Sequence, residues 1–105
     1  MKFTIDECLA KLPLPANDKR KNGVWDTEPN KTGEVALVLC APERDDFQTF
    51  HEENEYYFIA RGSGELVLDD ERFEFEAEDA FFVPAKILHR FENFTVDFAT
   101  WAIFF

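Results

Sequence analysis

Most of this chain alternates between short apolar runs and polar turn residues, a pattern typical of β-strands. From residue 34 onward we expect strands over 34–40, 47–51, 55–61, 64–69, 71–76, 79–83, 88–92 and 96–105. Asp69 and Asp70 indicate a tight turn between two of these runs. Phe73 and Phe75 alternate with charged residues, which indicates one buried and one solvated face. The pattern predicts an antiparallel sandwich or barrel.

The first third of the chain has a different pattern. Thr4 and Glu7 form a capping-box sequence, and apolar residues follow at helical spacing until Pro13, which predicts one short helix. In the proline-containing stretch that follows, only Val24 and Trp25 have the composition of a brief strand. We therefore expect residues 1–33 to form an N-terminal helix and an extended arm packed on a β-barrel of residues 34–105, as one structural domain.

Composition and charge limit the partners of the protein. A chain of 105 residues is long enough for one compact domain. Its 22 acidic and 11 basic residues give a net charge of −11, which repels phosphate backbones and anionic lipid. We expect no nucleic-acid or membrane partner. Cys8 and Cys40 form no Cys-x-x-Cys pair, and no signal peptide is visible, which predicts reduced thiols in a cytoplasmic protein.

Three metal-capable side chains lie near the ends of predicted strands. His51 and Glu55 come just before or at the start of one apolar run, and His89 lies on another run behind a turn. Two imidazoles and one carboxylate can occupy one face of a divalent metal and leave positions open for water or substrate. Each residue alone is more typical of a structural or solvated side chain. Together they make a metal site the leading hypothesis.

The spacing of these residues resembles the two sequence motifs of the cupin family. His51, Glu55 and Gly62 fall on the second His, the Glu and the closing Gly of the first motif. Pro84, His89 and Asn93 fall on the Pro, the His and the Asn of the second motif. The resemblance covers residues 34–105 and implies an all-β double-stranded β-helix, the jelly-roll barrel of cupins, with the short helix outside.

The chain departs from the family motifs at several positions. Thr49 stands where the family usually has its first His, so at most three of the four usual protein ligands are present. Glu43 and Glu78 replace the opening glycines, and Lys86 replaces the glycine after the motif proline. An open ligand position fits a catalytic metal, but the same loss could weaken metal binding until the site is empty.

The resemblance implies a divalent metal, such as Fe, Mn, Ni or Zn, held by His51, Glu55 and His89. Thr49, Tyr57 and Phe91 share the strand parity of these three residues, so we assign them to the pocket. Two functions stay open. The first is a metal-dependent enzyme acting on a small organic molecule, of dioxygenase, isomerase or decarboxylase type. The alternative is a non-catalytic small-molecule binding or sensing module with a weak or empty metal site.

The last predicted strand, 96–105, is apolar on both faces. One face of such a strand belongs to its own core, and the other must be covered by a second sheet or by a partner subunit. We therefore expect a homodimer. No G-x-S-x-G elbow, Walker loop or dinucleotide fingerprint occurs in the sequence, which disfavours hydrolase and nucleotide chemistry.

Overall fold

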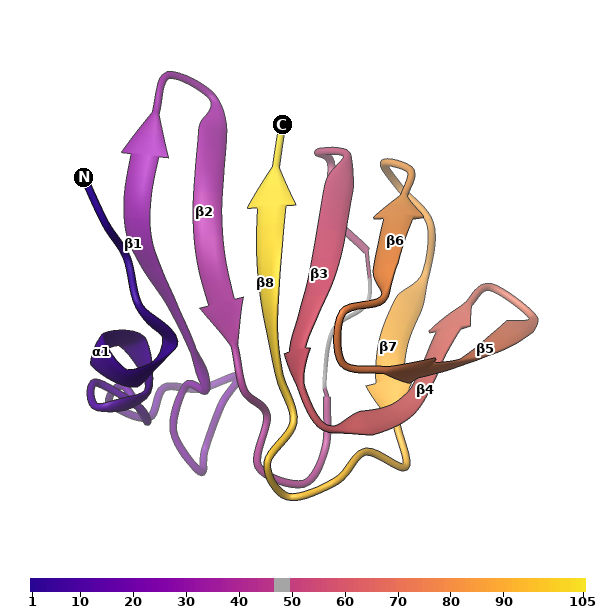
Figure 1. Cartoon of the computed structure of the whole chain (residues 1–105), viewed down its shortest axis with the longest axis horizontal. Coiled ribbons are helices and arrows are strands. Elements are labelled where there is room, and N and C mark those ends of the chain that lie inside the picture. The colour runs from indigo at the N-terminus through magenta and orange to yellow at the C-terminus, as the bar shows by residue number, and fades with distance from the viewer. Residues whose placement is uncertain (47–49) are drawn as a thin grey trace.

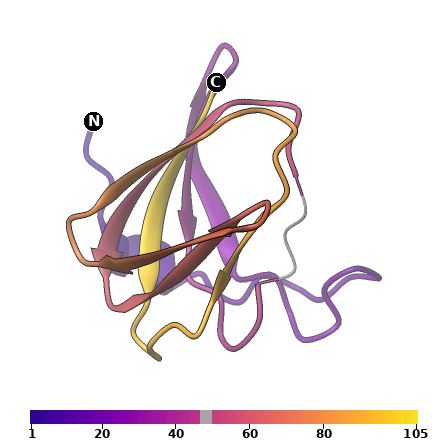
Figure 2. The ribbon, with the colours of Figure 1, turned by 90° about the vertical axis from the view of Figure 1, so that its right-hand side faces the viewer.

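The computed structural model describes residues 1–46 and 50–105. The helix α1 (Ile5–Leu9) precedes strands β1 (Asp26–Thr32), β2 (Val35–Cys40), β3 (Glu55–Arg61), β4 (Ser63–Leu68), β5 (Glu71–Glu76), β6 (Ala80–Val83), β7 (His89–Glu92) and β8 (Ala99–Phe104). A five-stranded sheet has the order β1-β2-β8-β3-β6, and a three-stranded sheet has the order β5-β4-β7. All neighbouring strands are antiparallel. The two sheets face each other and form an all-β barrel (Figure 1 and Figure 2).

The strands predicted from residue 55 onward and over 34–40 are present within a few residues of their expected bounds. The strand predicted over 47–51 is not found at Phe50 and His51, and the rest of that range lies outside the described residues. The His51 backbone is instead hydrogen-bonded to the turn that contains Lys86. The His51 carbonyl accepts a hydrogen bond from the Lys86 amide at 2.7 Å. Phe50 is 47% exposed, so its apolar side chain does not mark a buried strand position.

Strand β1 was not predicted, because its polar sequence lacks apolar alternation. It pairs with β2 from Asp26 opposite Cys40 to Thr32 opposite Val35, with an irregularity between Thr27 and Asn30. Pro29 lies inside this irregularity, where its missing amide donor does no harm to the ladder. Residues 26–32 thus belong to the five-stranded sheet, where the sequence pattern suggested an extended arm.

The main core lies between the two sheets. Tyr57, Leu66 and Phe91 are almost completely buried there, each from a different strand. A smaller cluster lies on the outside of the five-stranded sheet, where α1 packs Cys8 against Leu39 and Ala99. The helix begins as predicted, because the Thr4 hydroxyl accepts a hydrogen bond from the Glu7 amide at 3.2 Å. No helix in the described part of the chain is long and apolar enough to cross a membrane.

Candidate metal centre

The side chains of His51, Glu55 and His89 converge inside the barrel. One potential ligand atom from each residue lies within 4.8 Å of the other two. Glu55 begins β3 of the larger sheet, His89 begins β7 of the smaller sheet, and His51 lies in the segment that leads into β3. The structure therefore brings together the three residues that the sequence selected, while their binding of a metal stays a prediction.

The turn after β6 positions the backbone around His51. The Lys86 amide donates to the His51 carbonyl at 2.7 Å, and the Ala85 amide donates to the Asn54 side chain at 3.0 Å. Lys86 has a φ of 66°, in the left-handed region that favours glycine. Lys86 occupies a position where the resembling motif has glycine. The chain thus keeps the glycine-like backbone at this turn without the glycine.

The His89 ring is oriented by its own backbone. Its Nδ1 lies 2.9 Å from the carbonyl oxygen of Ile87. A carbonyl only accepts hydrogen bonds, so Nδ1 carries the proton and donates, which leaves Nε2 with a free lone pair when the ring is neutral. Nε2 lies 3.3 Å from Oε1 of Glu55. This pairing of one ring nitrogen with a backbone carbonyl is the usual way a protein orients a ligating imidazole.

Three buried acceptor atoms at the cluster lack a hydrogen-bond partner among the described residues. They are both carboxylate oxygens of Glu55 and Nε2 of His89. Glu55 and His89 are 1% and 2% exposed, so bulk water does not solvate these atoms. Leaving a buried polar group unsatisfied costs about 1–3 kcal/mol, and more for a charged group. A divalent cation between the three atoms would remove this penalty, so the donor set fits a metal.

The surroundings shift the pKa values of the two histidines in opposite directions. Burial lowers the pKa of His51. The Glu55 carboxylate raises that pKa, but it only partly offsets the effect of burial. Burial alone also lowers the pKa of His89, but the Glu55 carboxylate and the Ile87 carbonyl raise it above its ordinary value. His51 is therefore a neutral base at neutral pH, ready to ligate. His89 must give up its proton before Nε2 binds a cation.

Tyr57 and Phe91 form an aromatic wall beside the cluster. Both are buried, and their ring centroids lie 4.7 Å apart in an edge-to-face arrangement. The Tyr57 ring centroid is 6.1 Å from that of His89. Both residues also belong to the main core, so they close the inner side of the cluster. Thr49, the third predicted pocket residue, lies outside the described residues.

Three further residues in or next to the two motifs, Arg61, Gly62 and Asn93, have structural roles in this fold. Arg61 pairs with Asp6 at 2.9 Å on the surface and lies away from the cluster. Asn93 has a φ of 51°, in the turn that follows β7. Gly62 has a φ of 84°, and a Cβ there would lie 2.4 Å from the Thr95 hydroxyl. The closing glycine of the first motif is therefore required by the tight turn from β3 to β4.

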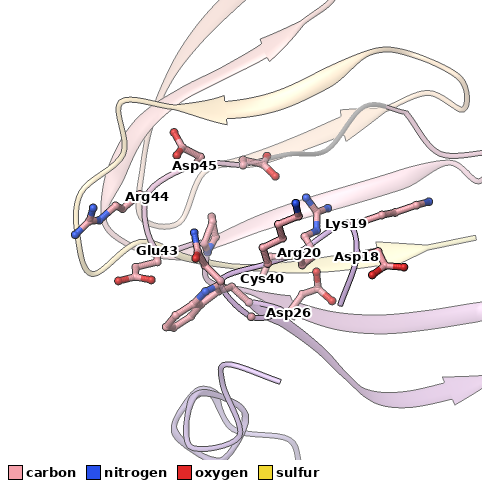
Figure 3. Close-up of a pocket in the computed structure, with 14 residues that line it drawn as sticks. Asp18, Lys19, Arg20, Asp26, Cys40, Glu43, Arg44 and Asp45 are labelled. Atoms are coloured by element: carbon pink, nitrogen blue, oxygen red, sulfur yellow. The ribbon is translucent and has the colours of Figure 1, made fainter. Parts of the chain in front are cut away.

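A separate cavity of about 300 Å³ lies between residues 18–26 and 40–46. In Figure 3 the side chains of Arg20 and Asp26 lie near that of Cys40. Desolvation raises the pKa of the Asp26 carboxyl, although the residue as a whole is exposed, and Arg20 and His51 oppose that rise. The cavity wall is therefore within electrostatic reach of the cluster, but none of the three cluster residues lines the cavity.

Sequence reasoning did not assign this cavity. The basic run of Lys19, Arg20 and Lys21 lies in the proline-containing stretch of the sequence, and such a run alone is typical of a solvated loop. Its position opposite the acidic segment Asp45 and Asp46 depends on β1 pairing with β2, which local pattern did not reveal. The run of three basic residues was thus the local feature of the sequence that could have indicated this cavity.

Comparisons with known proteins agree with the fold. The family model described as "Cupin domain" matches residues 36–102. An uncharacterised protein of Methanocaldococcus jannaschii is 41% identical over 39 residues, which are 37% of this chain and 31% of that protein. This chain thus matches about a third of the length of that curated relative.

Solved structures share the barrel. A cupin 2 conserved barrel domain protein from Salinispora arenicola CNS-205 has 25% identity and a TM-score of 0.63, over 76% of this chain and 73% of that one. The iron(II) form of HppE has 18% identity and a TM-score of 0.55, over 69% of this chain and 43% of that one. The second likeness concerns the fold alone.

Proposed function

Because this chain belongs to the cupin family, we propose that it binds one divalent metal ion through His51, Glu55 and His89 and acts on a small organic molecule beside that metal. The observation that carries the proposal is the set of buried acceptor atoms on Glu55 and His89 that have no hydrogen-bond partner in the described chain. Such atoms are rare in folded proteins unless an ion, a water or a reaction needs them.

A divalent metal at this position supplies Lewis-acid or oxygen-activating chemistry when bound. The residues of the chain do the remaining work. Tyr57 and Phe91 exclude water from the inner side of the cluster, which strengthens electrostatic interactions there. The carbonyl of Ile87 holds the His89 ring with Nε2 directed at Glu55. Three protein ligands leave open positions for an oxygen-bearing substrate.

The proposed reaction class is that of a dioxygenase, an isomerase or a decarboxylase. The iron(II) structure of HppE supports Fe among the candidate metals Fe, Mn, Ni and Zn, because it has the same barrel. The net charge of −11 also favours uptake of a cation over uptake of a highly anionic substrate.

One observation favours a second candidate function. Thr49 stands where the resembling motif has its first histidine, so this chain has one imidazole fewer for the metal. A three-ligand site binds more weakly, and a barrel with an empty or weak site serves as a non-catalytic binding or sensing module. Turnover distinguishes the two functions, since a binding module holds its ligand unchanged.

We also propose a cytoplasmic location and a homodimer. Both cysteines are buried and free, as expected of a protein in a reducing compartment. Burial raises the pKa of Cys40 well above its ordinary value, so this thiol stays protonated and unreactive. Exposed apolar side chains on the outside of the five-stranded sheet, Tyr56, Phe58, Phe82 and Phe105, support contact with a second copy.

The experiment that tests the metal proposal is a chelator-competition titration with Zn²⁺, Mn²⁺ and Fe²⁺ under anaerobic conditions. We expect one metal per chain in the wild type and at least tenfold weaker binding after His89→Ala or Glu55→Gln. Glu74→Gln is the matched control, because it removes one exposed carboxylate on β5 and should leave affinity unchanged. Unchanged metal binding in His89→Ala, or none in the wild type, would contradict the proposal.

A further inference from the structure

Asp46 joins the segment that leads to His51 to the strand that carries His89. Its Oδ2 accepts a hydrogen bond from the Phe91 backbone amide at 2.8 Å. Asp46 lies five residues before His51, and Phe91 lies two residues after His89. The bond is therefore a direct link between the chain segments that carry the two imidazoles of the cluster.

The position of β7 explains why the Phe91 amide needs this acceptor. Among the described strands, β7 is at one edge of the three-stranded sheet and has β4 on its other side. Phe91 is 1% exposed, and its amide donates outward from the sheet to the half-buried Asp46. A buried backbone amide without an acceptor is costly, so this pairing holds Asp46 against β7.

A second backbone contact anchors the same segment at His51 itself. The His51 carbonyl accepts a hydrogen bond from the Lys86 amide, in the turn that precedes His89. The Asp46 carboxylate bonds on the other side of His89, at Phe91. Removing the Asp46 bond would therefore leave the backbone before His51 without this anchor to β7.

The His51 ring depends on this backbone for its place beside His89. The centroids of the two rings are 5.1 Å apart. Burial is the largest influence on the pKa of both histidines and lowers it, while the Asp46 carboxylate is among the smaller influences that raise both values. Asp46 is thus within electrostatic reach of both imidazoles, in addition to its hydrogen bond to β7.

We propose that Asp46 is a positioning residue of the metal site, whose bond to the Phe91 amide holds the segment before His51 against β7 so that the His51 imidazole meets His89. Asp46 acts here through the backbone of Phe91. Because His51 supplies one of only three protein ligands in the cluster, its placement should affect metal affinity. The effect on metal binding rests on the proposed function, whereas the placement of His51 does not.

Three variants separate the hydrogen bond of Asp46 from its charge. Asp46→Asn keeps an oxygen that can accept from the Phe91 amide and removes the charge, whereas Asp46→Ala removes both. Asp79→Ala is the matched control, because Asp79 Oδ2 likewise accepts from a backbone amide, that of Glu76, at 2.9 Å. Asp79 is half-buried like Asp46, but it is not among the charges that influence either histidine of the cluster.

Circular dichroism shows whether each variant is folded. Asp46→Ser replaces Asp46→Ala if the alanine variant does not fold, because its shorter side chain also gives up the direct bond to the Phe91 amide. If neither variant folds while Asp79→Ala does, Asp46 is a residue of fold stability, and the positioning role is overturned.

Proton NMR of the metal-free protein tests the placement of His51 without any metal. The measurement is the nuclear Overhauser contact between the ring protons of His51 and His89, whose rings are neighbours in the structure. We expect this contact in the wild type, in Asp46→Asn and in Asp79→Ala, and we expect its loss in Asp46→Ala. A contact of wild-type strength in Asp46→Ala, or no contact in the wild type, would overturn the positioning role.

Zn²⁺ titration with a competing chelator tests the consequence for metal binding. Asp46→Asn and Asp46→Ala carry the same charge, so their difference isolates the hydrogen bond, and we expect the asparagine variant to bind Zn²⁺ about threefold more tightly or better. Asp79→Ala should bind like the wild type. Equal Zn²⁺ affinity in the two Asp46 variants would overturn the role of Asp46 in the metal site. A wild type that binds no Zn²⁺ but shows the Asp46-dependent ring contact would contradict the proposed function and leave the placement of His51 by Asp46 standing.

Discussion

His89 Nε2 lies 3.3 Å from Glu55 Oε1, and both atoms are buried. Glu55 belongs to the five-stranded sheet and His89 to the three-stranded sheet, so their approach links the two walls of the barrel. A buried carboxylate beside an imidazole is weak evidence for stability, because desolvation offsets the attraction between the two groups. This approach of the two residues is the geometry that the proposed metal site needs, with one cation held by both.

Glu55→Gln should therefore separate stability from metal binding. The Gln amide can donate to Nε2 of His89, so the metal-free variant should unfold at the same temperature as the metal-free wild type or above it. Metal at about 100 times the wild-type Kd should stabilise the wild type by about 2.7 kcal/mol, and the variant, which binds at least tenfold more weakly, by about 1.4 kcal/mol or less. Thermal unfolding with and without Zn²⁺ measures both effects. A metal-free variant destabilised by more than about 2 kcal/mol would show that the carboxylate itself holds the fold.

Metal binding should release a proton from His89. The pKa of His89 is raised above its ordinary value of 6.5, so the ring is protonated below that raised pKa. Apparent metal affinity should rise by about tenfold per pH unit below the raised pKa and level off above it. His51, whose pKa is lowered, adds a proton to this competition only at more acidic pH. Calorimetry with Zn²⁺ in two buffers of different ionisation enthalpy counts the protons, and an affinity independent of pH would contradict this assignment.

Thr49→His should add the imidazole that the resembling motif has and this chain lacks. Position 49 is two residues before His51, and we expect metal affinity to increase by about tenfold or more. Chelator competition beside the wild type measures this change. Glu74→His is the control, because it adds an imidazole at an exposed position of β5. Equal tightening in both variants would mean that the added histidine acts without joining the cluster.

Glu78→Gly should stabilise the protein by about 0.5 kcal/mol, because Glu78 has a φ of 80° that favours glycine. The Glu78 amide keeps its hydrogen bond to the Ile59 carbonyl, at 2.8 Å, in the variant. Glu76→Gly is the control, and it should destabilise by about 0.5–1 kcal/mol because Glu76 lies in strand β5. Urea unfolding of both variants gives the comparison. A loss of stability in Glu78→Gly would show that its side chain makes a contact that outweighs the strain.

The sequence by itself determined the features that depend on local chemistry. The alternation of Phe73 and Phe75 with charged residues is a property of neighbouring residues, and it correctly predicted strand β5. Thr4 and Glu7 likewise predicted the cap of α1. The spacing of His51, Glu55 and His89 selected the three residues that converge in the barrel, because their intervals match a known motif.

Only the tertiary structure decided the features that depend on distant partners. Strand β1 has a polar sequence and forms because β2 offers it hydrogen bonds from Asp26 to Thr32. The apolar sequence of β8 did not reveal that α1 would cover Ala99 while Phe105 stays 42% exposed. Backbone pairing and coverage of a sheet are non-local, since they are settled by which segments meet after the chain has folded. Local pattern therefore selected the candidate site residues, and the packing of distant segments brought them together.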